Sequence, residues 1–250
     1  MLEGLYSAAA GMQAQQQRID SVANDLANVN TNGYKHTRVA FRDLLYVNDA
    51  SGNVHSGAGA AATTIGRGFT QGAMRETGNP LDVAIQGNGL MVVQAPGGER
   101  YTRDGNLQIN SQGQLVTAGG NPVLGNSGPI VLQPTDHDVV ISADGTVTVQ
   151  EGAAHTDSIR GKLRLVSFAD AQTLLKQGNN LYSAGDGGTA QADIKSTIQQ
   201  GFVEKSNVNS VSEMSKMIEV MRAYTSIANI LQQESDLHKN AIDKLADVPA

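Results

Sequence analysis

The chain has 250 residues, 40% of them hydrophobic, which is enough for a buried core in one large or two modest domains. Its net charge is −6 and its Lys and Arg residues are scattered singly, so nucleic-acid binding is disfavoured. The sequence contains no Cys, which excludes thiolate metal sites, disulfides and a cysteine nucleophile.

The N-terminal segment, residues 1–33, predicts a long helix. Apolar residues recur there at alternating three- and four-residue steps, the a and d spacing of a narrow helix-packing seam. We expect an assembly interface at Leu5, Met12, Ile19, Val22, Leu26 and Val29. The helix should end near Asn30–Gly33, where Gly can adopt the left-handed conformation that closes a helix. A single helix cannot bury its own stripe, so the seam needs the other terminus or another molecule as its partner.

Residues 34–76 predict an extended connector. Within it, the stretch Val47–Thr64 is rich in Gly, Ala and Ser and can bury very little side-chain area. We expect this stretch to be a flexible loop, or a hairpin ordered only by its neighbours.

Residues 77–204 predict an antiparallel β-rich domain, because the hydrophobic period changes to two from about Ile65 onward. The expected strands are Leu81–Ile85, Leu90–Val93, Leu107–Ile109, Gln114–Thr117, Val139–Ile141, Thr146–Val149 and Lys162–Val166. Tight turns are expected at Pro96–Gly98, Asp104–Gly105, Asp144–Gly145 and Asp186–Gly187, since Gly accepts positive φ there.

The C-terminal segment, residues 205–250, predicts a second long helix with its own seam. We expect it to begin at Ser210, whose hydroxyl and the Glu213 side chain would form a capping box. The expected interface positions are Met214, Met217, Met221, Tyr224 and Leu231. A Met stripe at helical spacing is either core filler or an adaptable surface for several partners.

No pattern in the sequence predicts enzymatic chemistry. The His residues show no metal-ligand spacing, and Asp136-His137-Asp138 reads as a solvated loop. Gly125-Asn-Ser-Gly128 lacks the second Gly of a nucleophile turn, and the glycine-rich stretches lack a strand-to-helix crossover. We therefore expect no catalytic residue, no cofactor and no metal. A basic, apolar signal peptide and a run of about 18 apolar residues are both missing, which predicts a cytoplasmic protein unless export leaves the N-terminus uncut.

Three ordered motifs nevertheless resemble those of the bacterial flagellar hook and rod family. They are Ala23-Asn-Asp-Leu-Ala-Asn-Val-Asn-Thr-Asn-Gly-Tyr-Lys35, then Asn79–Gly89 followed by Tyr101-Thr-Arg-Asp-Gly105, and Gly201-Phe-Val-Glu-Lys-Ser-Asn-Val-Asn209 with the later Arg222-Ala-Tyr224. The positions that carry the resemblance are Asn28, Asn32, Gly33, Asn79, Pro80, Leu81, Asp82, Thr102, Arg103, Asp104, Gly105, Ser206, Asn207, Val208, Asn209, Arg222 and Tyr224.

The resemblance implies an α+β, mainly β fold. Long N- and C-terminal helices would pair as a coiled-coil-like stalk, and the antiparallel β-rich domain would lie between them in sequence. It also implies a structural subunit of the basal-body rod that polymerises helically through its terminal helices into a hollow drive shaft. The implied partners are further copies of itself, other rod and hook subunits, the flagellar type III export apparatus and the surrounding ring proteins. The implied location is the periplasmic rod, reached without a cleaved signal peptide.

The position within the rod stays open at this point. The long small-residue insert after Leu44-Leu-Tyr46 favours the distal type, whereas Gly120–Gly125 and Gly128-Pro-Ile130 favour the proximal type. A hook-type subunit and, from other classes, a monomeric β-rich binding module or a hydrolase are the alternatives. The chain departs from the family at Leu90 and Met91, where two aromatics are usual, and at Ser226–Ile230, which replaces a polar stretch.

Overall fold

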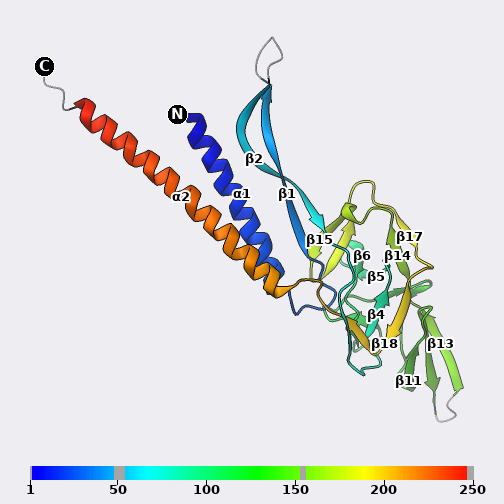
Figure 1. The fold of residues 1–250 in the computed structure, drawn as a ribbon. Helices are drawn as coiled ribbons and strands as arrows, with labels where there is room; N and C mark the ends of the chain where they lie inside the picture. Colours follow the sequence, from blue (N-terminus) through cyan, green and yellow to red (C-terminus); the bar gives the residue numbers. More distant parts are fainter. Residues whose placement is uncertain (1, 48–53, 153–155, 247–250) are drawn as a thin grey trace. The chain divides into compact units, whose positions relative to one another are not determined.

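The computed structural model of the chain describes residues 2–47, 54–152 and 156–246, which form two compact units (Figure 1). Unit 1 contains the two long helices and the strand pair that follows the first helix, and unit 2 contains residues 28–36 and 67–208. The chain therefore crosses from one unit to the other after residues 27, 36, 66 and 208. Contacts rather than chain order define these units, and the four-part division expected from the sequence stays a prediction.

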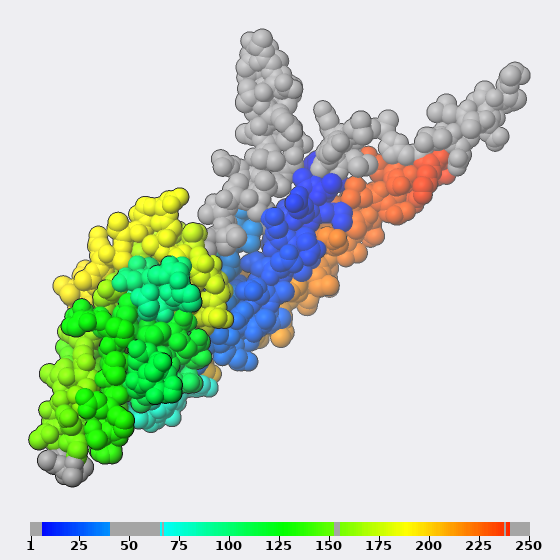
Figure 2. All heavy atoms as spheres, turned by 180° about the vertical axis from the view of Figure 1, so that it is seen from behind, coloured from blue at the N-terminus to red at the C-terminus, as the bar shows by residue number. Residues whose placement is uncertain are grey.

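The two helices of unit 1 are α1 (Leu2–Ala27) and α2 (Ser210–Ala246). They lie side by side, as the blue and orange helices of Figure 1 and the neighbouring blue and orange atoms of Figure 2 show. Helix α2 begins at the expected residue. Helix α1 ends before Asn30, because residues 28–31 form a turn in which the Thr31 amide donates to the Asn28 carbonyl and the Thr31 hydroxyl to the Asn28 side chain, both at 3.1 Å.

Asn209, not Ser210, caps the start of α2. The Asn209 side-chain oxygen accepts the Ser212 amide at 3.1 Å, and its carbonyl accepts the Glu213 amide at 3.0 Å. Glu213 pairs with Lys216 at 2.6 Å. The cap expected at Ser210 was therefore placed one residue too late, since Asn and Ser cap helices about equally well and the sequence does not rank them.

Unit 1 also contains β1 (Thr37–Val47) and β2 (Val54–Arg67), which form a two-stranded sheet. Most of the small-residue stretch is therefore strand, and residues 48–53 near its start lie outside the described residues. Isolated two-stranded sheets are at best marginally stable in water, so this pair depends on its surroundings.

Unit 2 is built from short strands. They are β3 (Met74–Glu76), β4 (Val83–Gln86), β5 (Leu90–Ala95), β6 (Gly98–Thr102), β7 (Leu107–Ile109), β8 (Leu115–Thr117), β9 (Leu124–Gly125), β10 (Gly128–Pro129), β11 (Asp136–Ile141), β12 (Thr146–Glu151), β13 (Thr156–Lys162), β14 (Leu165–Phe168), β15 (Leu174–Gly178), β16 (Leu181–Ala184), β17 (Ala190–Ala192), β18 (Thr197–Gln200) and β19 (Phe202–Glu204), with a short 3-10 helix η1 at Ala171–Thr173.

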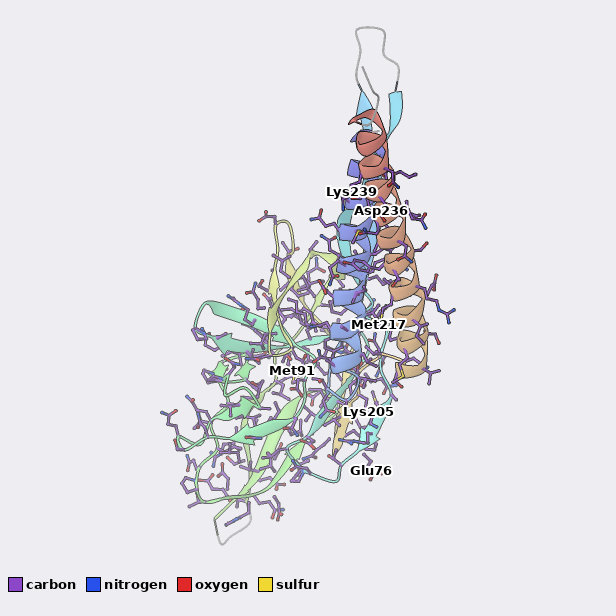
Figure 3. All side chains as sticks on the ribbon, turned by 90° about the vertical axis from the view of Figure 1, so that its left-hand side faces the viewer. Glu76, Met91, Lys205, Met217, Asp236 and Lys239 are labelled. Carbon is purple, nitrogen blue, oxygen red and sulfur yellow. The ribbon has the colours of Figure 1, made fainter. Side chains whose placement is uncertain are left out.

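The centre of unit 2 is a six-stranded antiparallel sheet in the order β15-β16-β6-β5-β14-β17. Leu90 and Val92 of β5 belong to one hydrophobic cluster, and Met91 and Val93 to the other. Since successive side chains of a strand point to opposite faces, both faces of this sheet are covered. Met91, labelled in Figure 3, is fully buried, so the apolar pair at the family's usual aromatic positions still fills the core.

Two of the four expected glycine turns join paired strands. Gly98 (φ 103°) begins β6 directly after the turn from β5, and Gly145 (φ 88°) lies between β11 and β12. Gly187 (φ 81°) lies between β16 and β17, which are not neighbours in the sheet. Gly105 makes no hairpin turn: a Cβ there would overlap the Val83 carbonyl oxygen, so this position needs Gly for a close backbone approach. The α+β, mainly β class is confirmed, and the coiled-coil geometry of the helix pair stays a prediction.

Candidate assembly interface

The face that α1 and α2 bury within the chain is shifted from the seams expected from the sequence. Among the described side chains of the two helices, Ala14 and Val220 are the buried apolar ones, at 7% and 1% exposure. A Cβ at Gly11 would lie 3.7 Å from Ile227 Cδ1, so the small residues of α1 allow close approach of α2. Gly11, Ala14, Val220 and Ile227 are not on the expected seams.

Most of the expected seam residues are nonetheless partly buried. Met12, Ile19, Val22 and Leu26 on α1, and Met217, Tyr224 and Leu231 on α2, are half-buried. Met217 is labelled on α2 in Figure 3. Val29 follows the end of α1 and belongs to unit 2, and the side chain of Leu5 lies outside the described residues. The role of these residues in assembly stays a prediction.

Helix α2 carries a second apolar stripe that is exposed. Val211 is 72% exposed, Met214 52%, and Ile218 and Met221 54% each. Their spacing of three, four and three residues is that of a helix-packing seam. The stripe continues into a shallow groove lined by Ile218, Met221, Arg222, Thr225, Ser226 and Asn229. A contiguous exposed seam of this kind is suited to contact with another helix.

A buried charge cluster in unit 2 joins the three sequence motifs. Glu204 on β19 accepts Lys35 Nζ at 2.6 Å through Oε1 and Arg103 Nε at 2.9 Å through Oε2. All three side chains are at most 3% exposed. The N-terminal motif supplies Lys35, the central motif Arg103 and the C-terminal motif Glu204, so residues more than 100 positions apart meet at one point.

Backbone groups complete the hydrogen bonding of this cluster. Arg103 donates to the carbonyls of Gly87 at 2.8 Å, Gly89 at 2.5 Å and Ile85 at 3.3 Å, and Lys35 donates to the Thr70 carbonyl at 2.8 Å. Burial lowers the pKa of Lys35, and the Glu204 carboxylate opposes that effect. A buried charge is tolerated where it is paired and hydrogen-bonded, which is the case here.

The central motif also contains a pair of neighbouring carboxyl groups, those of Asp82 and Asp104. Asn106 Nδ2 donates to buried Asp82 at 2.9 Å, and the Asn106 amide donates to Asp104 at 3.1 Å. Burial raises the pKa of Asp104, and the nearby Asp82 charge adds to the rise. Thr102 Oγ1 donates to the Asn180 carbonyl at 2.9 Å. These contacts shape a turn, and we assign them no chemical role.

The other motif residues also hold loops. The Asn79 side chain accepts the Leu81 amide at 3.2 Å, and the Pro80 carbonyl accepts Gln200 Nε2 at 2.8 Å. Asn180 Nδ2 donates to the Asn32 carbonyl at 2.8 Å, and the Ser206 hydroxyl accepts the Val208 amide at 3.2 Å. Gly33 (φ 69°) leaves no room for a Cβ, which would lie 2.6 Å from the Asp104 amide nitrogen. These motif residues therefore hold loops of unit 2 against one another, and they do not form a reactive centre.

No group of three His, Asp or Glu side chains within the described ranges is arranged to hold a metal ion. None of the helices described has a stretch long and apolar enough to cross a membrane.

Comparison with known proteins connects these features. Three family models match successive parts of the chain: "Flagella basal body rod protein" over residues 5–35, "Flagellar hook protein FlgE/F/G D1 domain" over 84–149 and "Flagellar basal body rod FlgEFG protein C-terminal" over 199–244. The chain is 36% identical to flagellar basal-body rod protein FlgF of Caulobacter vibrioides, over 99% of this chain and 100% of that relative. It is 32% identical to FlgG of Bacillus subtilis, over 97% and 99%.

The chain belongs to the flagellar basal-body rod family. It is also 37% identical to FlgG of Buchnera aphidicola subsp. Baizongia pistaciae, over 90% of this chain and 92% of that relative. The rod family is structural, and this rod-family chain is a structural component of the flagellar basal body rather than an enzyme. Membership implies assembly with other rod and hook subunits.

Sequence reasoning missed two features of the site. The exposed stripe of α2 overlaps the expected seam only at Met214 and Met221, because α2 is apolar on more than one face and periodicity does not say which face packs inside the chain. The Glu204 cluster was not predicted as a unit. Each of the three motifs supplies one of its charged residues to the cluster, and the signs of these charges complement one another.

Proposed function

We propose that this rod-family chain polymerises helically through α1 and α2, forming the wall of a hollow drive shaft. The exposed stripe Val211, Met214, Ile218 and Met221 carries the proposal, because a stripe that its own chain leaves uncovered is suited to a helix of a second copy. Contact between different patches on neighbouring copies is heterologous and does not close, so it generates a helical tube.

We further propose the distal rod type and a location in the periplasm after uncleaved export through the type III apparatus. The long insert, which forms most of β2, supports the distal type. The Gly120–Gly125 and Gly128–Ile130 segments favour the proximal type. Imaging of basal bodies from a gene-deletion strain separates the two: loss of the outer part of the rod supports the distal type, and loss of the inner part the proximal type.

Self-association of the purified chain tests the assembly proposal. Ile218→Asp places a carboxylate in the stripe, where burial against a second copy would desolvate it. Ile230→Asp is the matched control, because Ile230 lies on another flank of α2 and is 55% exposed, against 54% for Ile218. We expect polymers by sedimentation and electron microscopy from the wild type and Ile230→Asp, and monomers from Ile218→Asp. Equal assembly of both variants, or a wild type that stays monomeric at high concentration, would refute the proposal.

A further inference from the structure

Three segments of unit 2 adjoin the crossings between the two units, and they lie together. Residues 33–36 precede the crossing after residue 36, residues 68–72 follow the one after 66, and residues 204–207 precede the one after 208. The Gly33 amide donates to the Glu204 carbonyl at 2.7 Å, and the Gly68 amide to the His36 carbonyl at 3.0 Å. The Lys205 amide donates to the Ala73 carbonyl at 2.9 Å.

One side chain of the third segment, that of Asn207, contacts both of the other two segments. Asn207 Oδ1 accepts the His36 amide at 2.8 Å. Asn207 Nδ2 donates to the Gly68 carbonyl at 2.6 Å and to the Thr70 carbonyl at 3.0 Å. An amide group suits this task because it offers an acceptor and two donors at once.

Glu204 anchors the same three segments to the core. Its Oε1 accepts Lys35 Nζ from the first segment and the Gly72 amide, at 2.7 Å, from the second. Its Oε2 accepts Arg103, which is bound in turn to the backbone around β4 and β5. Asn207 is half-buried and lies next to the crossing, whereas Glu204 is fully buried. The two residues therefore have different roles. Glu204 holds the segments to the core of unit 2, and Asn207 aligns their ends.

We propose that Asn207 is a positioning residue that fixes the relative alignment of the three crossing segments. In a rotating rod, torque that passes along the chain between the units at these three crossings would pass through these segments. If these segments were free to slide past one another, the repeating contacts of a tube would lose their register. This last consequence rests on the proposed function, and the alignment itself does not.

Amide hydrogen exchange of the purified protein, resolved by residue, tests the alignment. Asn207→Ala removes the acceptor of the His36 amide. It also removes the donor that holds the Gly68 carbonyl, and so loosens the bond from the Gly68 amide to the His36 carbonyl. Both amides should therefore exchange about tenfold faster. Asn207→Asp keeps an oxygen for the His36 amide but turns the donor group into a second acceptor facing two carbonyls. In that variant we expect His36 to stay slow and Gly68 to become fast. Asn88→Asp, the same change at an exposed turn residue, is the control and should leave both amides slow.

The outcomes separate a local clamp from a general structural role. Faster exchange at His36 and Gly68, with unchanged exchange in β5, supports the proposal. Equal acceleration throughout unit 2, or no change at the two amides in Asn207→Ala, overturns it. Polymer assembly is scored in parallel. A wild type that does not polymerise would count against the proposed function, while the exchange result would still decide the role of Asn207.

Discussion

Glu204→Gln is expected to destabilise unit 2 severely while changing its shape very little. Gln has the same length and keeps an oxygen acceptor, but it is neutral. The variant leaves Lys35 and Arg103 buried at 1% and 3% side-chain exposure with no negative charge between them. Part of the loss is offset, because both cations keep their backbone acceptors at Thr70, Gly87 and Gly89.

Removing one partner of a buried ion pair costs about 3–5 kcal/mol, because the remaining charge stays desolvated. For a unit of about 150 residues, each kcal/mol lowers the thermal midpoint by about 2–4 °C. The midpoint of unit 2 should therefore fall by roughly 6–20 °C. Since domains are stable by about 5–15 kcal/mol, the variant should still fold at room temperature.

Thermal unfolding followed by circular dichroism in the β region measures this effect. Glu99→Gln is the matched control: its ion pair with Arg164 is half-exposed, and exposed pairs contribute about 0–1 kcal/mol. Adding Lys35→Met to Glu204→Gln removes one of the two cations left without a carboxylate partner, and it should recover part of the lost stability. If Glu204→Gln unfolds within one or two degrees of Glu99→Gln, the cluster does not hold unit 2 together and the argument fails.

Further predictions concern other parts of the chain. Leu26→Asp should abolish motility in a swimming assay while the unfolding midpoint of unit 2 stays unchanged, because the carboxylate would be buried without a partner at every repeated interface; normal swimming would contradict it. Gly33→Ala should lower the midpoint by several degrees, since its φ is positive and a Cβ has no room. The hydrogen bond from Arg160 lowers the pKa of Asp136, so the Asp136 carboxylate stabilises the fold fully above the ordinary carboxyl pKa range, and this stabilisation is lost as the pH falls through the lowered pKa. The difference in unfolding midpoint between the wild type and Asp136→Asn should therefore persist at pH 6 and vanish in acid. Deleting residues 50–62 should change the monomer midpoint by only about 1–2 °C, yet make rods flexible or prevent their stacking in electron micrographs.

The elements of the fold that the sequence predicted best are those with long, regular periodicity. The two terminal helices follow from apolar spacing, and α2 begins at the expected residue. The ends of elements were less predictable, because the Asn28–Thr31 turn competes locally with the helix, and Asn209 and Ser210 are comparable as caps. Strands such as β15 and β18 were missed, since only Leu174 and Ile198 respectively are fully buried in them.

The site was less predictable than the fold for a physical reason. Periodicity identifies the apolar faces of a helix, but the face used inside the chain depends on close approach at small residues such as Gly11. Charged residues are usually solvated, so Lys35 and Glu204 gave no sign of burial in the sequence. Only their meeting in space, across three distant motifs, reveals the cluster.

Photo-crosslinking in assembled basal bodies tests the central claim most directly. A photoreactive amino acid replaces Ile218 in one strain and Ile230 in another, and isolated basal bodies are irradiated. The stripe predicts that position 218 gives strong crosslinks to a second copy of the chain or a neighbouring rod subunit, with much weaker ones from position 230. Uncrosslinked monomer at position 218, with normal rods present, would contradict the claim that this face of α2 builds the rod.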